Sequence, residues 1–303
     1  MSATHRIQNT IYSLLLSLIC VSSFAENSGL LVSTSWLAER IDDPNLVILH
    51  IGKEKDFAEG HIPGARQLDV VADFAHPNSQ TYSADSLYLE LPEIAQLEAK
   101  LESVGISNDS TLVLYWPGDT ITSATRALFT LDWAGLGKQS YLLNGGLDAW
   151  KKANYQLSTD ISPITKGDLT LTVNADLIAT AEWVKEHGNH PGVGLVDARP
   201  KAFFDGVSSY QSIKGHIHGA GSTPWTAFVD NDLQLHDKAT LEKILADGGV
   251  QTGDVVVAYC HIGQFATMAL LAARTLGHDV KLYDGAFQDW AQKGLPVETA
   301  AQE

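Results

Sequence analysis

Short apolar runs rich in β-branched residues recur along the chain, and stretches with helical spacing separate them. The runs are residues 45–51 (NLVILHI), 111–116 (TLVLYW), 193–198 (VGLVDA) and 254–259 (DVVVAY). Helical patterns include residues 92–105 (PEIAQLEAKLESVG) and 238–249 (KATLEKILADGG). Nearly continuous apolar strands that alternate with helices indicate an α/β fold, in which helices cover both faces of a parallel sheet. Ligands bind such sheets at the carboxyl ends of the strands.

The same landmarks appear twice along the chain and in the same order. They are GHIPGAR and GHIHGAG, then the runs TLVLYW and DVVVAY, then YLLNGGLDAW and VKLYDGAFQDW. These repeats are far longer than those of solenoid proteins, so the duplication predicts two tandem α/β domains. We predict a first domain over residues 26–157, a linker over residues 158–171 and a second domain over residues 172–303.

The first 25 residues have the three-part pattern of a secretory signal. A polar start carrying Arg6 precedes an apolar run over residues 11–24, and the small residues Ser23 and Ala25 precede the expected cut. The apolar run is short for a membrane span, so an uncleaved anchor is the less favoured alternative. We therefore expect cleavage after Ala25 and a periplasmic or secreted protein.

The net charge and the number of cysteines restrict the possible partners and the possible roles of Cys260. After signal removal roughly 275 residues remain, enough for two ordinary domains. The formal net charge of −16 argues against nucleic acid and against anionic lipid as partners. Of the two cysteines, Cys20 lies in the predicted signal and Cys260 would be left alone in an oxidising compartment, where thiols are normally paired. Cys260 is then a buried filler, half of an intermolecular disulfide, or a nucleophile.

Cys260 directly follows the apolar run DVVVAY and opens a short loop that leads into a helix from about Ala266. Consecutive backbone N–H groups at such a helix start can bind an anion, and Gly263 allows the tight path that this requires. The same field favours a thiolate and lowers the pKa of the cysteine. A protonated His261 would add to it. The loop thus combines a nucleophile, an activating field and an anion site.

Three chemistries compete for this loop. A cysteine phosphatase needs an arginine six positions after the nucleophile, where this chain has Ala266. A cysteine protease needs a separate histidine base, for which His216, His218 and His278 are candidates without a supporting local pattern. Sulfur transfer needs only a thiolate and a cradle for an anionic donor, and both are present.

The pattern Cys-x-x-Gly-x-x-Ala, formed by Cys260, Gly263 and Ala266, resembles the active loop of the rhodanese sulfurtransferases. The companion motifs are VDAR, GHIHGA and LYDGAFQDW in the second half, and GHIPGA and LLNGGLDAW in the first. The resemblance covers nearly the whole predicted mature chain. It implies a tandem rhodanese of the thiosulfate sulfurtransferase type with one active site, in the second domain. It also implies no metal or organic cofactor, a small anionic sulfur donor, a thiophilic acceptor, and a monomer without a nucleic acid or membrane partner.

The resemblance assigns roles to individual residues. Cys260 would carry the sulfane sulfur as a persulfide, and the loop residues would bind the substrate: His261, Ile262, Gly263, Gln264 and Phe265. Arg199 would hold the sulfonate of the donor, with a structural ion pair to Asp197 as the alternative. Asp197 and Ala266 are assigned supporting roles. His216 and His218 would form a structural turn, and Trp225 and Phe228 would line the cleft or the core.

The first half departs from this pattern. It has Trp116 where the second half has Cys260, and His50 and Gly52 where the second half has Asp197 and Arg199. We therefore expect it to be non-catalytic and to shape the cleft.

The donor is less constrained by the residues. Mercaptopyruvate enzymes of this family have Gly-Ser after the cysteine and a histidine in the first half, where this chain has His261, Ile262 and Leu89. Thiosulfate is favoured by elimination, although Gln264 and Phe265 make the loop more apolar, which suits a thiol or persulfide donor. The alternative to an enzyme is a sulfur carrier with little turnover.

Overall fold

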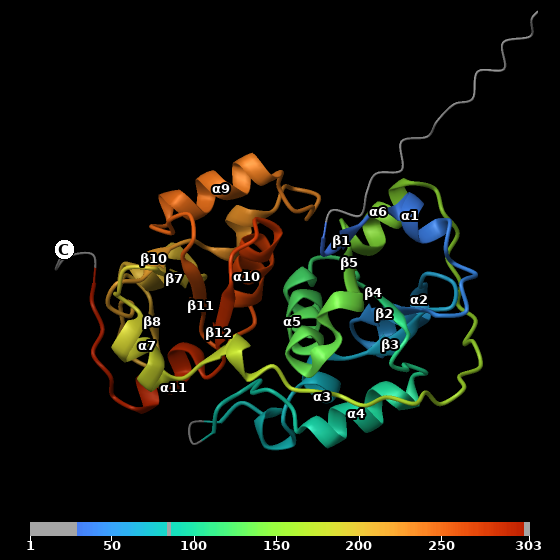
Figure 1. Cartoon of the computed structure of the whole chain (residues 1–303), viewed down its shortest axis with the longest axis horizontal. Coiled ribbons are helices and arrows are strands. Elements are labelled where there is room, and N and C mark those ends of the chain that lie inside the picture. Colours follow the sequence, from blue (N-terminus) through green and yellow to red (C-terminus); the bar gives the residue numbers. More distant parts are fainter. Residues whose placement is uncertain (1–28, 84–85, 300–303) are drawn as a thin grey trace, which may run out of the picture.

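The computed structural model describes residues 29–83 and 86–299, and it contains two α/β units (Figure 1). The predicted signal lies outside the described residues. Each unit is built on a five-stranded parallel sheet, as the apolar runs predicted. The first sheet has the order β1 (Leu31–Val32), β5 (Ser140–Leu143), β4 (Thr111–Tyr115), β2 (Leu46–Ile51) and β3 (Arg66–Leu68). The second has the order β10 (Gly221–Ser222), β7 (Val193–Asp197), β11 (Val255–Tyr259), β12 (Val280–Tyr283) and β6 (Ile178–Ala179).

The two sheets have the same topology. Read from the other edge, the second order is β6-β12-β11-β7-β10, which matches β1-β5-β4-β2-β3 strand for strand. The central strands pair in the same way, since Leu49 lies opposite Leu114 and Val196 lies opposite Ala258. The duplication predicted from the motifs is therefore a duplication of the fold.

Helices flank both sheets. In the first unit they are α1 (Thr34–Ala38), α2 (Glu54–Glu59), α3 (Val70–Phe74), α4 (Ile94–Ser103), α5 (Ile121–Leu131) and α6 (Gly146–Lys152). In the second they are α7 (Ala181–His187), α8 (Lys201–Phe204), α9 (Lys238–Asp247), α10 (Ala266–Thr275) and α11 (Ala286–Gln292). Single turns lie at Pro77–Ser79, Asp132–Leu136, Gly137–Gln139, Ala175–Leu177 and Trp225–Phe228, and a hairpin joins β8 (Ser209–Tyr210) to β9 (Ile213–Lys214). The helical patterns over residues 92–105 and 238–249 are confirmed as α4 and α9.

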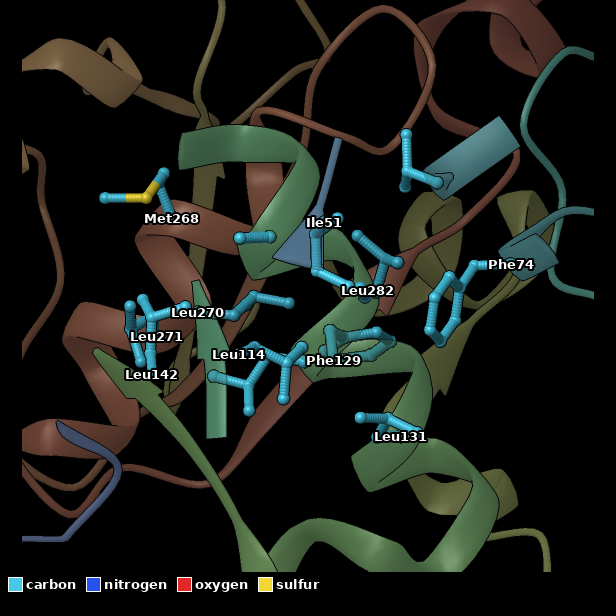
Figure 2. Close-up of a cluster of buried hydrophobic side chains, with 14 of the residues drawn as sticks. Ile51, Phe74, Leu114, Phe129, Leu131, Leu142, Met268, Leu270, Leu271 and Leu282 are labelled. Atoms are coloured by element: carbon cyan, nitrogen blue, oxygen red, sulfur yellow. The ribbon is translucent and has the colours of Figure 1, made fainter. Parts of the chain in front are cut away.

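The two units share one hydrophobic core. Helices α5 and α10 lie side by side between the sheets (Figure 1). Figure 2 shows side chains of both units in this cluster, among them Phe129 and Leu131 of α5 and Leu270 and Leu271 of α10. The contact also has a polar part, because the hydroxyls of Thr125 and Thr267 lie 2.8 Å apart. The helix predicted from about Ala266, which is α10, is thus packed directly against the other half of the chain.

The segment between the units is extended. Residues 159–174 contain no helix or strand, and they run along the first unit. Leu169 is buried there, and its N–H donates to Glu102 of α4. Among the described residues, no helix has the length and apolar character needed to cross a membrane.

Candidate active site

Cys260 lies at the carboxyl end of β11, one residue before a loop that leads into α10. Its side chain is buried, and the backbone N–H groups of Ile262, Gly263, Phe265 and Ala266 all face its sulfur. Helix α10 has no side-chain N-cap, so no side chain competes with the thiol for the N–H groups of Phe265 and Ala266. The predicted cradle of backbone donors around the thiol is present.

Gly263 gives this loop its path. Its φ of +78° lies in the left-handed region that favours glycine. A Cβ at this position would lie 2.9 Å from Nη1 of Arg126 and 3.0 Å from the carbonyl oxygen of Asp284. The glycine therefore serves both the turn and the close approach of two other segments.

The net effect on the thiol differs from the prediction. Burial raises the pKa of Cys260 above its ordinary value, and the four backbone N–H groups offset only part of that increase. The N–H groups of the loop lower the pKa of the cysteine as expected, but burial, which the sequence reasoning did not weigh, raises it by more. Removing the thiol from water destabilises its charged form by more than the backbone N–H groups stabilise it.

Asp197 and Arg199 form a buried ion pair beside this loop. Nη2 of Arg199 lies 2.6 Å from Oδ2 of Asp197, and Nε donates to Oδ1 at 2.9 Å. Burial alone would lower the pKa of Arg199, but the hydrogen bond and charge of Asp197 outweigh it and raise that pKa. The guanidinium also donates to the carbonyl of Gly215 at 2.7 Å and lies over the ring of Phe287, 3.8 Å from its centroid. The structural ion pair is present, and donor binding by Arg199 stays a prediction.

His261 carries no charge in this site. Burial, together with the positive charge of Arg199, lowers its pKa to about 3. The condition under which His261 would add to the positive field, its protonation, is therefore not met at physiological pH. Its ring instead stacks on Tyr210 and meets the edge of Phe203, with centroid distances of 4.5 Å in both cases.

The other predicted loop residues divide into two groups. Ile262 and Phe265 are half-buried and apolar, and the ring of Phe265 lies 5.7 Å from that of Trp225. Gln264 has a structural contact, because its amide nitrogen lies 3.1 Å from the hydroxyls of Thr122 and Ser123 at the start of α5. Phe228 lies in the core and not at the loop surface.

Arg126, which the sequence reasoning missed, reaches the loop from the first unit. It lies on α5 with a fully buried side chain, and its Nη2 is 2.6 Å from Oδ1 of Asp284. It donates to the carbonyl oxygens of Leu89 (2.7 Å) and Gly263 (3.4 Å). A single arginine in the otherwise apolar pattern ITSATRALFTL was the available signal, because such a charge is buried only with a partner.

A carboxyl pair accompanies this arginine. Burial and, to a lesser degree, the negative charge of Asp284 raise the pKa of Glu90 to about 8. Oδ2 of Asp284 accepts from the N–H of Leu91 at 2.9 Å. A cavity of about 460 Å³ borders Glu90 and Asp284. The first unit therefore contributes charge and hydrogen bonds directly behind the cysteine loop.

The histidines considered for a protease are engaged elsewhere. His216 stacks on Phe204 with centroids 3.6 Å apart, and its Nδ1 lies 2.9 Å from that residue's carbonyl oxygen. His218 lies 2.6 Å from Glu298, and His278 lies 2.9 Å from the carbonyl oxygen of Asp254. These contacts favour the structural turn predicted for His216 and His218.

Comparison with known proteins gives consistent relatives. A family model described as "Rhodanese-like domain" matches residues 33–153 and 180–293. The chain is 31% identical over 283 residues to the 3-mercaptopyruvate sulfurtransferase of Escherichia coli (strain K12), covering 88% of this chain and 97% of that one. It is 29% identical over 277 residues to the thiosulfate sulfurtransferase of Pseudomonas aeruginosa, covering 89% and 97%. The crystal structure of SseA, a 3-mercaptopyruvate sulfotransferase from Escherichia coli, superposes with a TM-score of 0.74 at 29% identity, covering 85% and 98%.

Proposed function

Since this chain belongs to the rhodanese-like family, we propose that it is a sulfurtransferase that carries a sulfane sulfur on Cys260. The observation that carries the proposal is the position of the thiol, which sits at a parallel-strand end with four backbone N–H groups facing its sulfur. Backbone N–H groups in this arrangement can bind an anion. Transfer of a sulfane sulfur uses such an anion site and needs no general base. Thiosulfate is the proposed donor, and mercaptopyruvate use is compatible with the relatives.

The first half-reaction loads the cysteine. The Cys260 thiolate attacks the outer sulfur of thiosulfate, a bond forms between Sγ and that sulfur, and the S–S bond of the donor breaks. Its electron pair leaves with sulfite, and a persulfide remains on the enzyme. The backbone N–H groups of Ile262, Gly263, Phe265 and Ala266 can stabilise the negative charge of the thiolate and then of the persulfide.

The second half-reaction removes the sulfane sulfur from Cys260. A thiophilic acceptor such as cyanide, or a thiolate, attacks the terminal sulfur of the persulfide. The electron pair of the S–S bond returns to Sγ, so the thiolate is regenerated and no oxidant is needed. The buried positive charge of Arg199 lies close enough to interact with the Cys260 thiolate and favours it in both steps.

Intact-mass measurement tests this proposal. Treatment with thiosulfate should add the mass of one sulfur atom, and cyanide should remove it. Cys260→Ser should give no cyanide-labile adduct. An unchanged adduct on that variant, or none on the wild type with any donor, refutes the proposal. A stable adduct that thiols and cyanide do not discharge would instead identify a sulfur carrier.

We also propose that the protein is exported, on the strength of the apolar run over residues 11–24 and the small residues before position 26. N-terminal sequencing of the protein recovered from a periplasmic or culture fraction should begin at Glu26. A chain that retains its first 25 residues in a membrane fraction would favour the anchor.

A further inference from the structure

A cavity of about 280 Å³ lies in the first unit, between α2, β3 and the extended segment that connects the two units. Figure 1 shows α2 and β3 on the side of the first unit that faces away from the second. The cavity is therefore separate from the site around Cys260. Its apolar lining consists of Phe57, Ala58, Ala65, Ile161 and Ile164.

Arg66 of β3 supplies the positive charge of this cavity. Its side chain is half-buried, and this burial lowers its pKa because water is removed from around the guanidinium. The group nevertheless stays protonated at physiological pH. Nη1 donates to the carbonyl oxygen of Gly64 at 2.9 Å, whereas Nε is buried and has no hydrogen-bond partner among the described residues. The cavity thus holds a partly desolvated cation with an unused donor.

Arg66 differs from the other arginines in the part of the chain that the structure describes. Four of these five arginines form an ion pair with a carboxylate: Arg40 with Glu39, Arg126 with Asp284, Arg199 with Asp197, and Arg274 with Asp132. Arg66 forms none with any described residue, although the formal net charge of the chain is −16. Glu54 also lines the cavity, but it is exposed and is not paired with Arg66. Burying a cation without an anion is costly, so the arrangement points to an anion from outside the chain.

The connecting segment leaves apolar surface open beside the cavity. Ile161 is 83% exposed and Ile164 is 43% exposed. Backbone hydrogen bonds hold the segment at both ends, since Ser158 pairs with His61 and the N–H of Gly167 donates to the carbonyl of Glu102. Between these points, the backbone of residues 161–165 forms no hydrogen bond with another described residue. A ligand with an apolar part would cover the two isoleucines and hold this stretch of the segment in place.

The second unit shows that the fold does not need an arginine at this position. The motifs GHIPGAR and GHIHGAG place Gly221 where the first half has Arg66, and the strand register agrees, because Arg66 lies opposite Leu49 and Gly221 lies opposite Val196. A Cβ at Gly221 would lie 1.8 Å from the carbonyl oxygen of Gly248, so backbone occupies this place in the second unit. The arginine and its cavity are therefore features of the first half alone.

We infer that this cavity binds a small organic monoanion with an apolar tail, of the class of medium-chain carboxylates, and that the carboxylate pairs with Arg66. A guanidinium binds a carboxylate through two parallel N–H donors, and the unpaired Nε of Arg66 supplies one of them. The tail packs against Phe57, Ile161 and Ile164. The volume equals that of roughly nine water molecules in the liquid, which suits a chain of about eight carbon atoms.

Isothermal titration calorimetry with three probes tests this inference. Octanoate, used below its micelle concentration, carries both the anion and the tail, butyrate carries the anion with a short tail, and 1-octanol carries the tail without the charge. We expect affinity to rise about threefold for each CH₂ group between butyrate and octanoate, because each buries apolar surface. Octanol should bind about tenfold more weakly than octanoate, because it cannot form the charge-assisted pair.

Variants separate the charge from the apolar contact. Arg66→Met should weaken octanoate binding about tenfold and leave octanol binding unchanged, whereas Glu54→Gln should strengthen binding of octanoate alone. Ile161→Ser should weaken both ligands severalfold, and it serves as the second variant should Arg66→Met not fold, because its side chain is largely exposed. Val207→Ser is the matched control, since Val207 is 76% exposed and does not line the cavity. Circular dichroism and thermal unfolding confirm that each variant is folded.

Three outcomes overturn the inference. The first is equal affinity for octanoate and octanol in the wild type, and the second is octanoate binding that neither Arg66→Met nor Ile161→Ser weakens. The third is the absence of binding by all three probes at millimolar concentration. None of these measurements involves Cys260, so the proposed function is tested independently.

Discussion

The two halves of the chain share the same hydrogen bond at the end of their central strands. In the first, the N–H of Ile62 donates to the hydroxyl of Tyr115 at 3.1 Å, and in the second the N–H of Ile217 donates to Tyr259 at the same distance. Both tyrosines end a central strand, β4 or β11. This hydrogen bond joins the isoleucine of each GHI motif to the end of the central strand. It is present in both halves, although only the second half has a cysteine after the strand.

A stacked pair is also preserved. Phe57 lies on His61 with centroids 3.7 Å apart and planes at 4°, and Phe204 lies on His216 at 3.6 Å and 5°. In both pairs Nδ1 of the histidine lies 2.9 Å from the carbonyl of the phenylalanine. These histidines support the turn, which explains their presence in a half without a thiol.

The halves differ at the residue that follows the strand. Trp116 is buried and fills the position that Cys260 occupies, and the N–H of Leu147 donates to its carbonyl as that of Phe287 does to Cys260. The indole requires Gly146, because a Cβ there would lie 2.7 Å from Cε2 of Trp116. A large apolar side chain has therefore replaced both the nucleophile and the space for a substrate.

The halves also differ in buried charge. Where the second has the Asp197–Arg199 pair, the first has His50, whose pKa burial lowers to about 4, and Gly52. A Cβ at Gly52 would lie 2.8 Å from Nε2 of His50, so no arginine fits there. The fold thus does not need the ion pair, and the half that keeps it is the half with a thiolate to stabilise.

The largest effect should come from Arg199→Met. It leaves Asp197 buried without its partner, which costs about 3–5 kcal/mol in the free energy of unfolding. Denaturant titration measures this loss, and the loading rate of Cys260 with thiosulfate should fall as well. His50→Gln in the first half is the matched control, and it should leave the loading rate unchanged. A fully stable and active Arg199→Met variant would contradict the comparison.

Trp116→Cys tests whether a thiol alone converts the first half. Removing the indole from the core should cost about 3 kcal/mol. The new cysteine should take up no cyanide-labile sulfur in a Cys260→Ser background, because the position lacks the Asp–Arg pair. Mass spectrometry after thiosulfate treatment measures this. A persulfide at position 116 would show that the strand-end position suffices.

Arg126→Met tests whether the first half acts on the cysteine loop. We expect a loss of about 2 kcal/mol in stability, because Asp284 and two carbonyl groups lose a buried donor. We expect kcat to fall by a larger factor than KM changes. The variant displaces the cysteine loop but leaves the exposed residues around it in place. Partial rescue of kcat by Arg126→Lys would support positioning through charge. Unchanged kcat in a folded Arg126→Met variant would exclude it.

The pH dependence of loading should reflect the raised pKa of Cys260. Because burial favours the neutral thiol, the thiolate fraction and the loading rate should rise about tenfold per pH unit through the ordinary range of cysteine. Alkylation by iodoacetamide measures the thiolate directly, with glutathione as the control. A plateau that begins near neutral pH would mean that the N–H groups outweigh burial.

The last prediction concerns the pH dependence of stability through Glu90. Its pKa rises from 4.5 to about 8 on folding, mainly through burial, so between these values the folded protein binds more protons than the unfolded chain. Stability contributed by the neutral form is therefore present at the lower end and is lost as pH rises toward 8. Glu90→Gln should flatten the dependence of the unfolding free energy on pH over this range. An equal slope in both proteins would assign the titration to another group.

Local pattern was sufficient to predict the sheet and to single out Cys260 as the candidate nucleophile. The strands at 46–51 and 255–259 were visible because strands buried on both faces need continuous apolar residues. Cys260 was identified because its position follows from a strand that ends, a glycine and a helix that begins. These are properties of adjacent residues, so they can be recognised without knowing which distant residues are in contact.

The electrostatics of the site could not be predicted in the same way. The expected lowering of the Cys260 pKa counted the backbone N–H groups alone, and His261 was considered only for the case in which it is protonated. Burial acts against the charged form of both side chains. The extent of desolvation depends on which segments pack over the loop. Local sequence shows which N–H donors and charged residues are near the cysteine. It does not show how much water folding removes from around them.

The sequence by itself therefore determined the duplicated α/β architecture and singled out Cys260 as the candidate nucleophile. Only the tertiary structure showed that Arg126, 137 residues from Gly263, reaches the cysteine loop, and that Tyr210 lies on His261. Periodicity records which face of an element is buried, whereas partners distant in sequence meet only through the packing of complete elements. That packing also set the protonation of the site, because burial, and not residue identity, controls the balance between neutral and charged forms.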